Sequence, residues 1–171
     1  HVRSRRQRQM CIRDSISTNF NWFKVPAITQ EVYFGIATEG AGTSSAHAGF
    51  AVGDQTGFVV PSTATTYATA GLLALDGSAA ITTLQGDLTL AAGYGSLTGT
   101  LSGSGYTLGI SAASSSTGTF SGSSSLSGNG ASGTGNSSGH FYSSGATSAI
   151  AGVANGTSGT SYVAGFGGVA K

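Results

Sequence analysis

Glycine is the feature that most limits what this chain can fold into. It supplies 29 of the 171 residues, well over twice the usual share of about 7%. Each glycine in a helix interior costs roughly 1 kcal/mol relative to alanine, so long helices are disfavoured. Strands joined by tight turns remain, and we expect an all-β protein.

Charge is the second limit. Residues 88–170 contain no Asp, Glu, Lys or Arg, so hydroxyl groups and the backbone must keep that region soluble. Disorder usually pairs low hydrophobicity with high net charge. Regularly spaced Leu, Ile, Phe and Tyr therefore favour a folded chain.

Strand patterns recur along the sequence. In 106–112 the large residues Tyr106, Leu108 and Ile110 take every second position, which indicates one buried face. A spacing of about ten residues with glycine-rich turns is typical of an antiparallel sandwich or barrel. Residues 122–139 are low in complexity and are predicted to form a mobile loop. The predicted strands are 32–37, 46–52, 57–60, 66–75, 87–91, 95–101, 106–112, 117–121, 140–142, 149–154 and 161–170.

The closing region, 138–171, predicts a hairpin. Its turn is placed at 155–159, where Asn and Gly tolerate the positive φ of a tight reversal. In the last strand Tyr162, Ala164 and Phe166 share one face, while Val163 and Val169 share the other with two glycines. Neither face is charged, which favours a closing barrel or sandwich strand over a solvated edge.

The same region carries a family resemblance. Gly139, Phe141, Tyr142, Ala146 and Gly152 fit the pattern Gly-x-Phe-Tyr/Phe-Gly-x-x-Ala-x-Glu-x-x-Gly, whereas a serine follows Tyr142 and no Glu precedes Ile150. This resembles the C-terminal barrel of the transferrin-binding-protein-B family. That family includes factor-H-binding lipoproteins and related solute-binding surface lipoproteins of Gram-negative bacteria.

Three earlier segments follow the strand order of that family: 65–71 contains Tyr67, 95–103 contains Gly-x-Leu-x-Gly-like spacing, and 117–122 ends in Phe-Ser-Gly. The resemblance implies an antiparallel β-barrel of about eight strands with Gly/Ser-rich loops over 65–171, after N-terminal strands or a partial companion region at 16–64.

The function that the resemblance implies is non-enzymatic. It is that of a bacterial binding protein, secreted or on the outer-membrane surface, whose ligand is a protein such as an iron or haem carrier. Membrane attachment would use a lipid anchor that these residues do not include. No cofactor, metal or catalytic residue is implied, and the ligand-binding residues stay unknown.

Two other classes share this composition. Adhesin or autotransporter passengers are also rich in Gly, Ser and Thr, and they stack parallel rungs. An outer-membrane barrel needs a lipid-facing apolar band with aromatic girdles. Here the closing strand ends in Ala170-Lys171 and the strands carry mostly Ala, Gly and Thr, so this class ranks last.

Residues 1–15 differ from the rest. They hold five of the seven Lys and Arg residues and the only Cys and Met, and they resemble a translated sequencing adapter. On that interpretation they carry no information about fold or function. From residue 16 onward two lysines oppose five acidic residues, a net charge of 2 − 5 = −3. This balance disfavours nucleic acid, which needs clustered Lys or Arg. The body also lacks a cysteine for a disulfide or a thiolate metal site.

Candidate chemistry is sparse. His47 and His140 have no Asp or Glu at ligand spacing, so surface or loop roles are favoured over zinc. A glycine flanks Ser104 on each side, but a nucleophile elbow needs a strand-to-helix turn. Tyr94 likewise lies between two glycines with no helix following to bind phosphate. Asp76 and Asp87 flank a predicted hairpin and are interpreted as turn caps.

Aromatic residues form two small groups. Phe20, Trp22 and Phe23 are expected to pack in a core or between domains, with an exposed recognition cluster as the alternative. Phe141 and Tyr142 are adjacent in a predicted strand. They are therefore expected to split between the barrel interior and its outer face.

Overall fold

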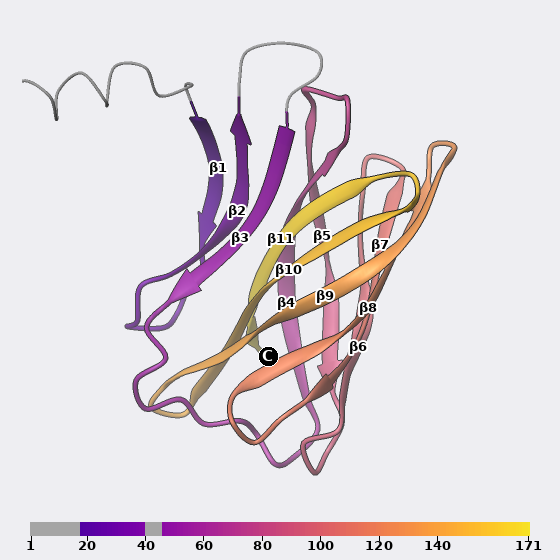
Figure 1. The fold of residues 1–171 in the computed structure, drawn as a ribbon. Helices are drawn as coiled ribbons and strands as arrows, with labels where there is room; N and C mark the ends of the chain where they lie inside the picture. Colours follow the sequence, from indigo (N-terminus) through magenta and orange to yellow (C-terminus); the bar gives the residue numbers. More distant parts are fainter. Residues whose placement is uncertain (1–17, 40–45) are drawn as a thin grey trace, which may run out of the picture.

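The computed structural model describes residues 18–39 and 46–171, and this part of the chain is all-β, without a helix. Figure 1 shows a barrel with a small sheet beside it. The expected all-β antiparallel barrel of about eight strands is confirmed. The strands are β1 (Thr18–Lys24), β2 (Val32–Glu39), β3 (Ala46–Gly53), β4 (Thr65–Leu75), β5 (Ile81–Leu90), β6 (Ser96–Gly103), β7 (Tyr106–Ser114), β8 (Thr119–Gly128), β9 (Ala131–Ser144), β10 (Thr147–Gly159) and β11 (Tyr162–Ala170).

The barrel closes in the order β10-β11-β4-β5-β6-β7-β8-β9, with every neighbouring pair antiparallel. All but one of its pairs are consecutive hairpin partners; the exception joins β11 to β4. Strand β11 therefore completes the barrel, as the uncharged faces of 161–170 predicted.

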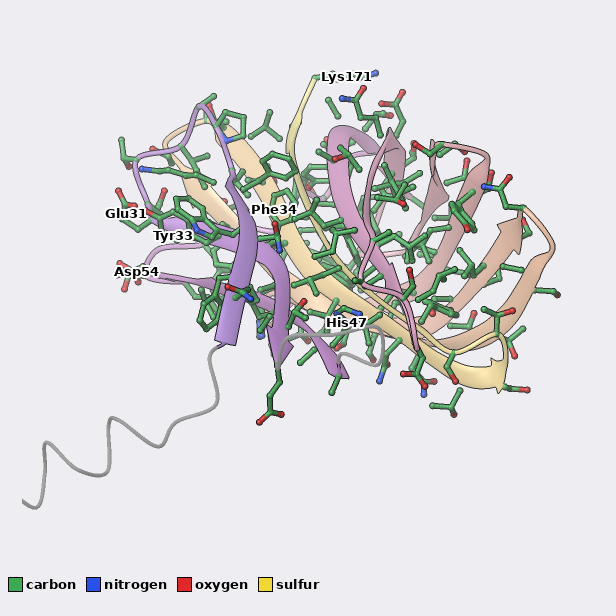
Figure 2. The ribbon with its side chains drawn as sticks, turned by 90° about the horizontal axis from the view of Figure 1, so that it is seen from above. Glu31, Tyr33, Phe34, His47, Asp54 and Lys171 are labelled. Atoms are coloured by element: carbon green, nitrogen blue, oxygen red, sulfur yellow. The ribbon has the colours of Figure 1, made fainter. Side chains whose placement is uncertain are left out.

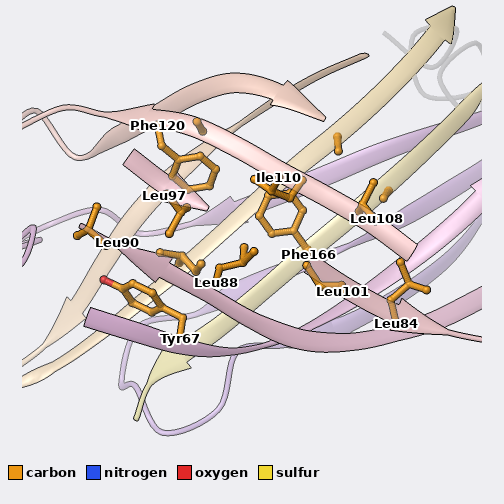
Figure 3. Packing of buried hydrophobic residues seen from close by; sticks show 14 of the residues in the cluster. Tyr67, Leu84, Leu88, Leu90, Leu97, Leu101, Leu108, Ile110, Phe120 and Phe166 are labelled. Atoms are coloured by element: carbon orange, nitrogen blue, oxygen red, sulfur yellow. The ribbon is translucent and has the colours of Figure 1, made fainter. Parts of the chain in front are cut away.

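The interior is filled by apolar side chains that alternate with outward residues along each strand (Figure 3). Phe120 lies between Phe141 and Phe166, with ring centroids 5.7 and 6.1 Å away. Two tyrosine hydroxyls inside the barrel are paired: Tyr67 with Ser148 Oγ at 2.9 Å, and Tyr162 with Ser124 Oγ at 2.7 Å. Burial raises the pKa of both tyrosines.

Inward-facing glycines make room for these rings. A Cβ on Gly139 would lie 2.3 Å from Phe120 Cζ, and one on Gly156 would lie 2.4 Å from Tyr162 Cε1. The close packing depends on those positions lacking a side chain. Part of the glycine content of the chain is thus explained by core packing.

Residues 122–139 correct the sequence-based prediction, because they form β8 and β9 instead of a mobile loop. In β8 the serines at 121, 123, 125 and 127 face outward, while the inward positions of β9 include glycines opposite large rings. The low-complexity sequence is therefore an ordinary two-residue strand alternation in which both faces carry mostly small residues. The reversal is the dipeptide Asn129-Gly130, at φ 48° and 78°, as in a tight hairpin turn.

The closing hairpin exists, but its turn was misplaced. Residues 155–159 belong to β10, which pairs with β9 as far as Gly133 and has a bulge between Gly156 and Ser158. The reversal falls at Thr160 and Ser161, before β11 begins. The long partner strand β9 keeps the Asn/Gly segment extended.

The predicted strand at 57–60 is also wrong, since this segment crosses one end of the barrel without pairing as a strand. Phe58 packs over Gly118, and Val60 is buried in the barrel core. Ser143 Oγ accepts from Val59 N and is also 2.9 Å from Val59 O, to which it donates. The segment closes the barrel end.

Strands β1, β2 and β3 form an antiparallel sheet, the N-terminal sheet, which lies against the outside of β10, β11 and β4. Strand β1 was missed by the sequence-based prediction. Apolar residues from both layers interlock here: Val32, Phe34 and Ile36 of β2 meet a wall that includes Ala149 and Ala151. At the closest approach, a Cβ on Gly165 would lie 2.3 Å from the Gly35 carbonyl oxygen.

Candidate binding surface

The side of the N-terminal sheet that faces away from the barrel carries a row of aromatic residues. Figure 2 shows Tyr33 and Glu31 on this outer side, whereas Phe34 lies between the sheet and the barrel. Strand pairing places Trp22 opposite Gly35 and Phe20 opposite Ala37, beside the outward residues of β3. We call this surface the aromatic face; its residues are Phe20, Trp22, Tyr33, Phe50 and Val52.

The aromatic face is exposed to solvent. Phe20 is 61% exposed, Trp22 54% and Val52 53%. Edge-to-face contacts order the rings, with Phe20 6.0 Å from Phe50 and Trp22 5.2 Å from Tyr33 between centroids. Such contacts hold large apolar side chains in fixed positions at the surface.

An ion pair flanks the aromatic face. Lys24 Nζ lies 2.7 Å from Glu31 Oε1 and 5.9 Å from the Tyr33 ring centroid, and the Tyr33 hydroxyl donates to Glu31. The hydrogen bond from Lys24, and then that from Tyr33, lowers the pKa of Glu31. The bond to Glu31 raises the pKa of both Lys24 and Tyr33. All three groups are exposed, so these contacts contribute little to the stability of the fold. Their main effect is to fix the side-chain positions of Lys24, Glu31 and Tyr33 beside the aromatic face.

These positions correct the packing prediction for Phe20 and Trp22, which are exposed. Phe23 points to the opposite side, where its ring is 5.8 Å from that of Phe34 and is 40% exposed. Tyr33, Phe50 and Val52 were not singled out from the sequence. Only the β1–β2–β3 register brings them beside Phe20 and Trp22.

A groove of about 600 Å³ lies beneath the edge of β1, between the N-terminal sheet and the barrel. Phe23 and Phe34 line its wall, and small outward residues such as Ala68 and Ala70 line its floor. A second groove, of about 590 Å³, crosses the outside of β7 to β10 and is lined by hydroxyls and amides, including Ser123 and Asn136.

The two histidines have different surroundings. His47 Nδ1 is 2.9 Å from Thr38 Oγ1, and its Nε2 is 2.7 Å from the Ser78 carbonyl, so the ring ties β3 to the turn after β4. His140 on β9 has a buried Nδ1 without a hydrogen-bond partner in the described part of the chain. Within residues 18–39 and 46–171 no group of three potential metal ligands is found.

The remaining candidates are structural. Ser104 and Tyr94 lie in turns with positive φ, 48° and 57°, between consecutive strands. Asp76 follows β4 in a turn as expected, but Asp87 lies within β5 and pairs with Lys171 Nζ at 2.7 Å, so it is not a turn cap.

The split predicted for Phe141 and Tyr142 is confirmed. Phe141 belongs to the barrel core, and Tyr142 packs between the barrel and the N-terminal sheet. Residues 1–15, interpreted as adapter-like, lie outside the described residues.

Together, the fold and the surface define a filled eight-stranded barrel that supports a sheet with an exposed aromatic face. The arrangement places exposed apolar side chains beside a charged rim on the surface. No helix in the described ranges is long and apolar enough to cross a membrane. The chain matches no family model and no curated protein.

Proposed function

We propose that this chain is a non-enzymatic bacterial binding protein of the transferrin-binding-protein-B-like barrel type, secreted or held at the outer-membrane surface. Its partner is a protein, and iron- or haem-carrying proteins are the first class to test. The aromatic face of the N-terminal sheet is the contact surface.

The observation that carries the proposal is the exposure of Phe20 and Trp22 on an ordered face. Tryptophan, tyrosine and phenylalanine are enriched in protein interfaces, where a few such residues supply most of the binding energy. An apolar patch rimmed by polar groups is typical of an interaction site. Lys24 and Glu31 supply that rim here.

The barrel topology favours this class over the two alternatives. An adhesin passenger would stack parallel rungs, whereas these strands form a closed antiparallel barrel whose last strand ends at Ala170. A barrel in lipid needs an apolar outer band. The outside of β6, β7 and β8 instead presents exposed polar residues such as Thr100, Ser111 and Ser123.

Filling of the interior also supports a protein ligand. Barrels that carry small molecules keep an internal chamber. In this barrel Tyr67, Phe120 and Phe166 lie in the interior with leucines around them (Figure 3), and Phe141 belongs to the same buried cluster. Binding on the outer surface is therefore favoured over binding inside.

The test is a binding measurement with the full chain immobilised and purified iron- and haem-carrying proteins passed over it. Trp22→Ser should weaken binding of the recognised partner by at least about tenfold, since interface tryptophans are frequent hot spots. Val59→Ser, at a residue 62% exposed outside the aromatic face, is the matched control and should leave affinity unchanged. Binding to none of these proteins, or equal affinity of the two variants, would refute the proposal.

Localisation has a separate test in the upstream gene. A reading frame recovered from native DNA should encode a secretion signal ending in a lipidated cysteine, or a secretion signal alone. An upstream sequence that continues without any secretion signal would contradict the proposed localisation.

A further inference from the structure

The free edge of β1 is a second feature that the proposed function does not use. Within the described residues β1 pairs only with β2. Edge strands are commonly blocked by proline, bulges or inward charges, because an open row of backbone donors and acceptors pairs readily with another strand. Strand β1 pairs in unbroken register, has no proline, and carries a single charge, at Lys24.

The register shows which backbone groups are open. Val25 N donates to Val32 O at 2.9 Å, so Val25 and Val32 form a hydrogen-bonded pair. Alternation along an antiparallel ladder then directs the backbone groups of Phe23, Asn21 and Asn19 toward β2. Those of Phe20, Trp22 and Lys24 face the open edge.

We infer that β1 pairs antiparallel with β1 of a second copy of this chain, about a two-fold axis at Asn21. This register pairs all seven residues of the strand with one another. Phe20 lies opposite Trp22 of the second copy and Trp22 opposite its Phe20. The even-numbered residues, whose backbone groups are open, form the hydrogen-bonded pairs. Two three-stranded sheets become one of six strands, with the interface isologous as a two-fold axis requires.

Charge complementarity supports this occupant. In this register Lys24 lies directly opposite Thr18 of the second copy. Thr18 in turn pairs with Glu39 of β2 in its own sheet, so Lys24 and that Glu39 lie in line across three neighbouring strands. Two strand spacings separate the backbones of Lys24 and Glu39, about 10 Å. Both residues lie on the outer side of their sheets. In the described part of the chain Glu39 makes no salt bridge, unlike Glu31 and Asp87.

Aromatic pairing and space also fit a second copy. Cross-strand aromatic pairs stabilise antiparallel strands, and this register makes two Phe20–Trp22 pairs on a face that already orders its rings. Beneath the edge, the groove of about 600 Å³ separates β1 from the barrel. The side chains of the second copy's β1 that point toward the barrel can therefore be accommodated in this groove.

Engineered disulfides test the register in the full chain, with Cys11 replaced by serine. In the inferred register the Asn21→Cys variant faces itself across the axis as a non-hydrogen-bonded pair, whose spacing of about 4.5 Å suits a disulfide. Mild oxidation should give a covalent dimer of twice 16.7 kDa. Asn19→Cys, on the same strand and side, faces Phe23 of the second copy and should stay unlinked. Equal cross-linking of the two variants, or none with Asn21→Cys, would overturn the inference.

Introducing opposite charges at Phe20 and Trp22 provides an independent test. Sedimentation across a range of concentrations measures the strength of the dimer. The unmodified chain should dimerise, and Phe20→Glu or Trp22→Lys alone should weaken the dimer by more than about tenfold. The double variant should recover it, because each new glutamate faces a new lysine of the other copy. A monomeric unmodified chain, or a double variant weaker than both single variants, would contradict the pairing. Tyr94→Lys, at an exposed turn residue, is the control for surface charge. The experiment contains only this chain, so its result does not depend on whether the proposed binding to another protein is correct.

Discussion

The outside of the barrel has two halves that differ in chemistry. On β6, β7 and β8 the outward residues are mostly hydroxyl side chains in contact with water, which we call the bare wall. On β10, β11 and β4 they are alanine, glycine, valine and leucine beneath the N-terminal sheet, which we call the covered wall. Outward chemistry therefore marks where another layer packs. By the same criterion, the aromatic face resembles a surface that a partner covers.

A substitution in the barrel interior should reduce stability more than any substitution on either wall. Phe166 is fully buried and lies beside Phe120, so Phe166→Ala should lower the free energy of unfolding by about 3 to 5 kcal/mol. Chemical denaturation measures this change. A loss under about 1 kcal/mol would mean that the ring is not part of the core.

The contact between the layers comes next. A side chain at Gly165 would meet the Gly35 backbone at 2.3 Å, so Gly165→Val should destabilise the protein by about 1 to 3 kcal/mol or more. On the bare wall the nearest atom to a Cβ at Gly109 would be the movable Ser125 Oγ at 2.7 Å, and the next is the Ser125 carbonyl oxygen at 3.9 Å. Gly109→Val should therefore cost under about 1 kcal/mol. Thermal melting of both variants measures these losses, and equal losses would show that the two walls are packed alike.

Placing a hydroxyl on the covered wall, or removing one from the bare wall, should change stability by a smaller amount. Ala151 on the covered wall is fully buried, so Ala151→Ser leaves a hydroxyl with poor access to water and should cost about 1 to 2 kcal/mol. Ser123 on the bare wall is exposed, and Ser123→Ala should change stability by no more than about 0.5 kcal/mol. Denaturation midpoints distinguish the two, and a reversed order would contradict the assignment of the walls.

The ion pair beside the aromatic face should give the smallest effect. The pKa of Glu31 is lowered by the bonds from Lys24 and Tyr33. Its contribution to stability is present above the unfolded pKa near 4.5 and is lost as the pH falls through the lower folded value. The pKa of Lys24 is raised, so its contribution is present below about 10.5 and is lost above the folded value.

NMR titration of the Glu31 carboxyl carbon measures this shift. The midpoint should lie below that of a model glutamate and should rise in Lys24→Met, which removes the largest cause of the shift. A midpoint unchanged by Lys24→Met would show that the pair does not form in solution.

The sequence predicted the barrel because two-residue alternation is local, as in the segment from Tyr106 to Ala112 that became β7. It failed at 122–139 because Ser and Gly carry no hydropathy contrast, although their alternation is meaningful once Phe120 and Tyr162 occupy the space left by glycine. The aromatic face was anticipated only in part, as the alternative interpretation of Phe20 and Trp22, and its other members were missed for a different reason. Tyr33 and Phe50 join Trp22 and Phe20 only through strand pairing, which is not local information.

Thiol labelling tests most directly the claim that outward chemistry marks a covered wall. With Cys11 replaced by serine, the thiol of Ala151→Cys should react with a maleimide only as fast as the N-terminal sheet opens, whereas the thiol of Ser123→Cys should react as fast as in a free peptide. Comparable rapid labelling at both positions would show that the N-terminal sheet does not cover β10, and would contradict the assignment of the covered wall.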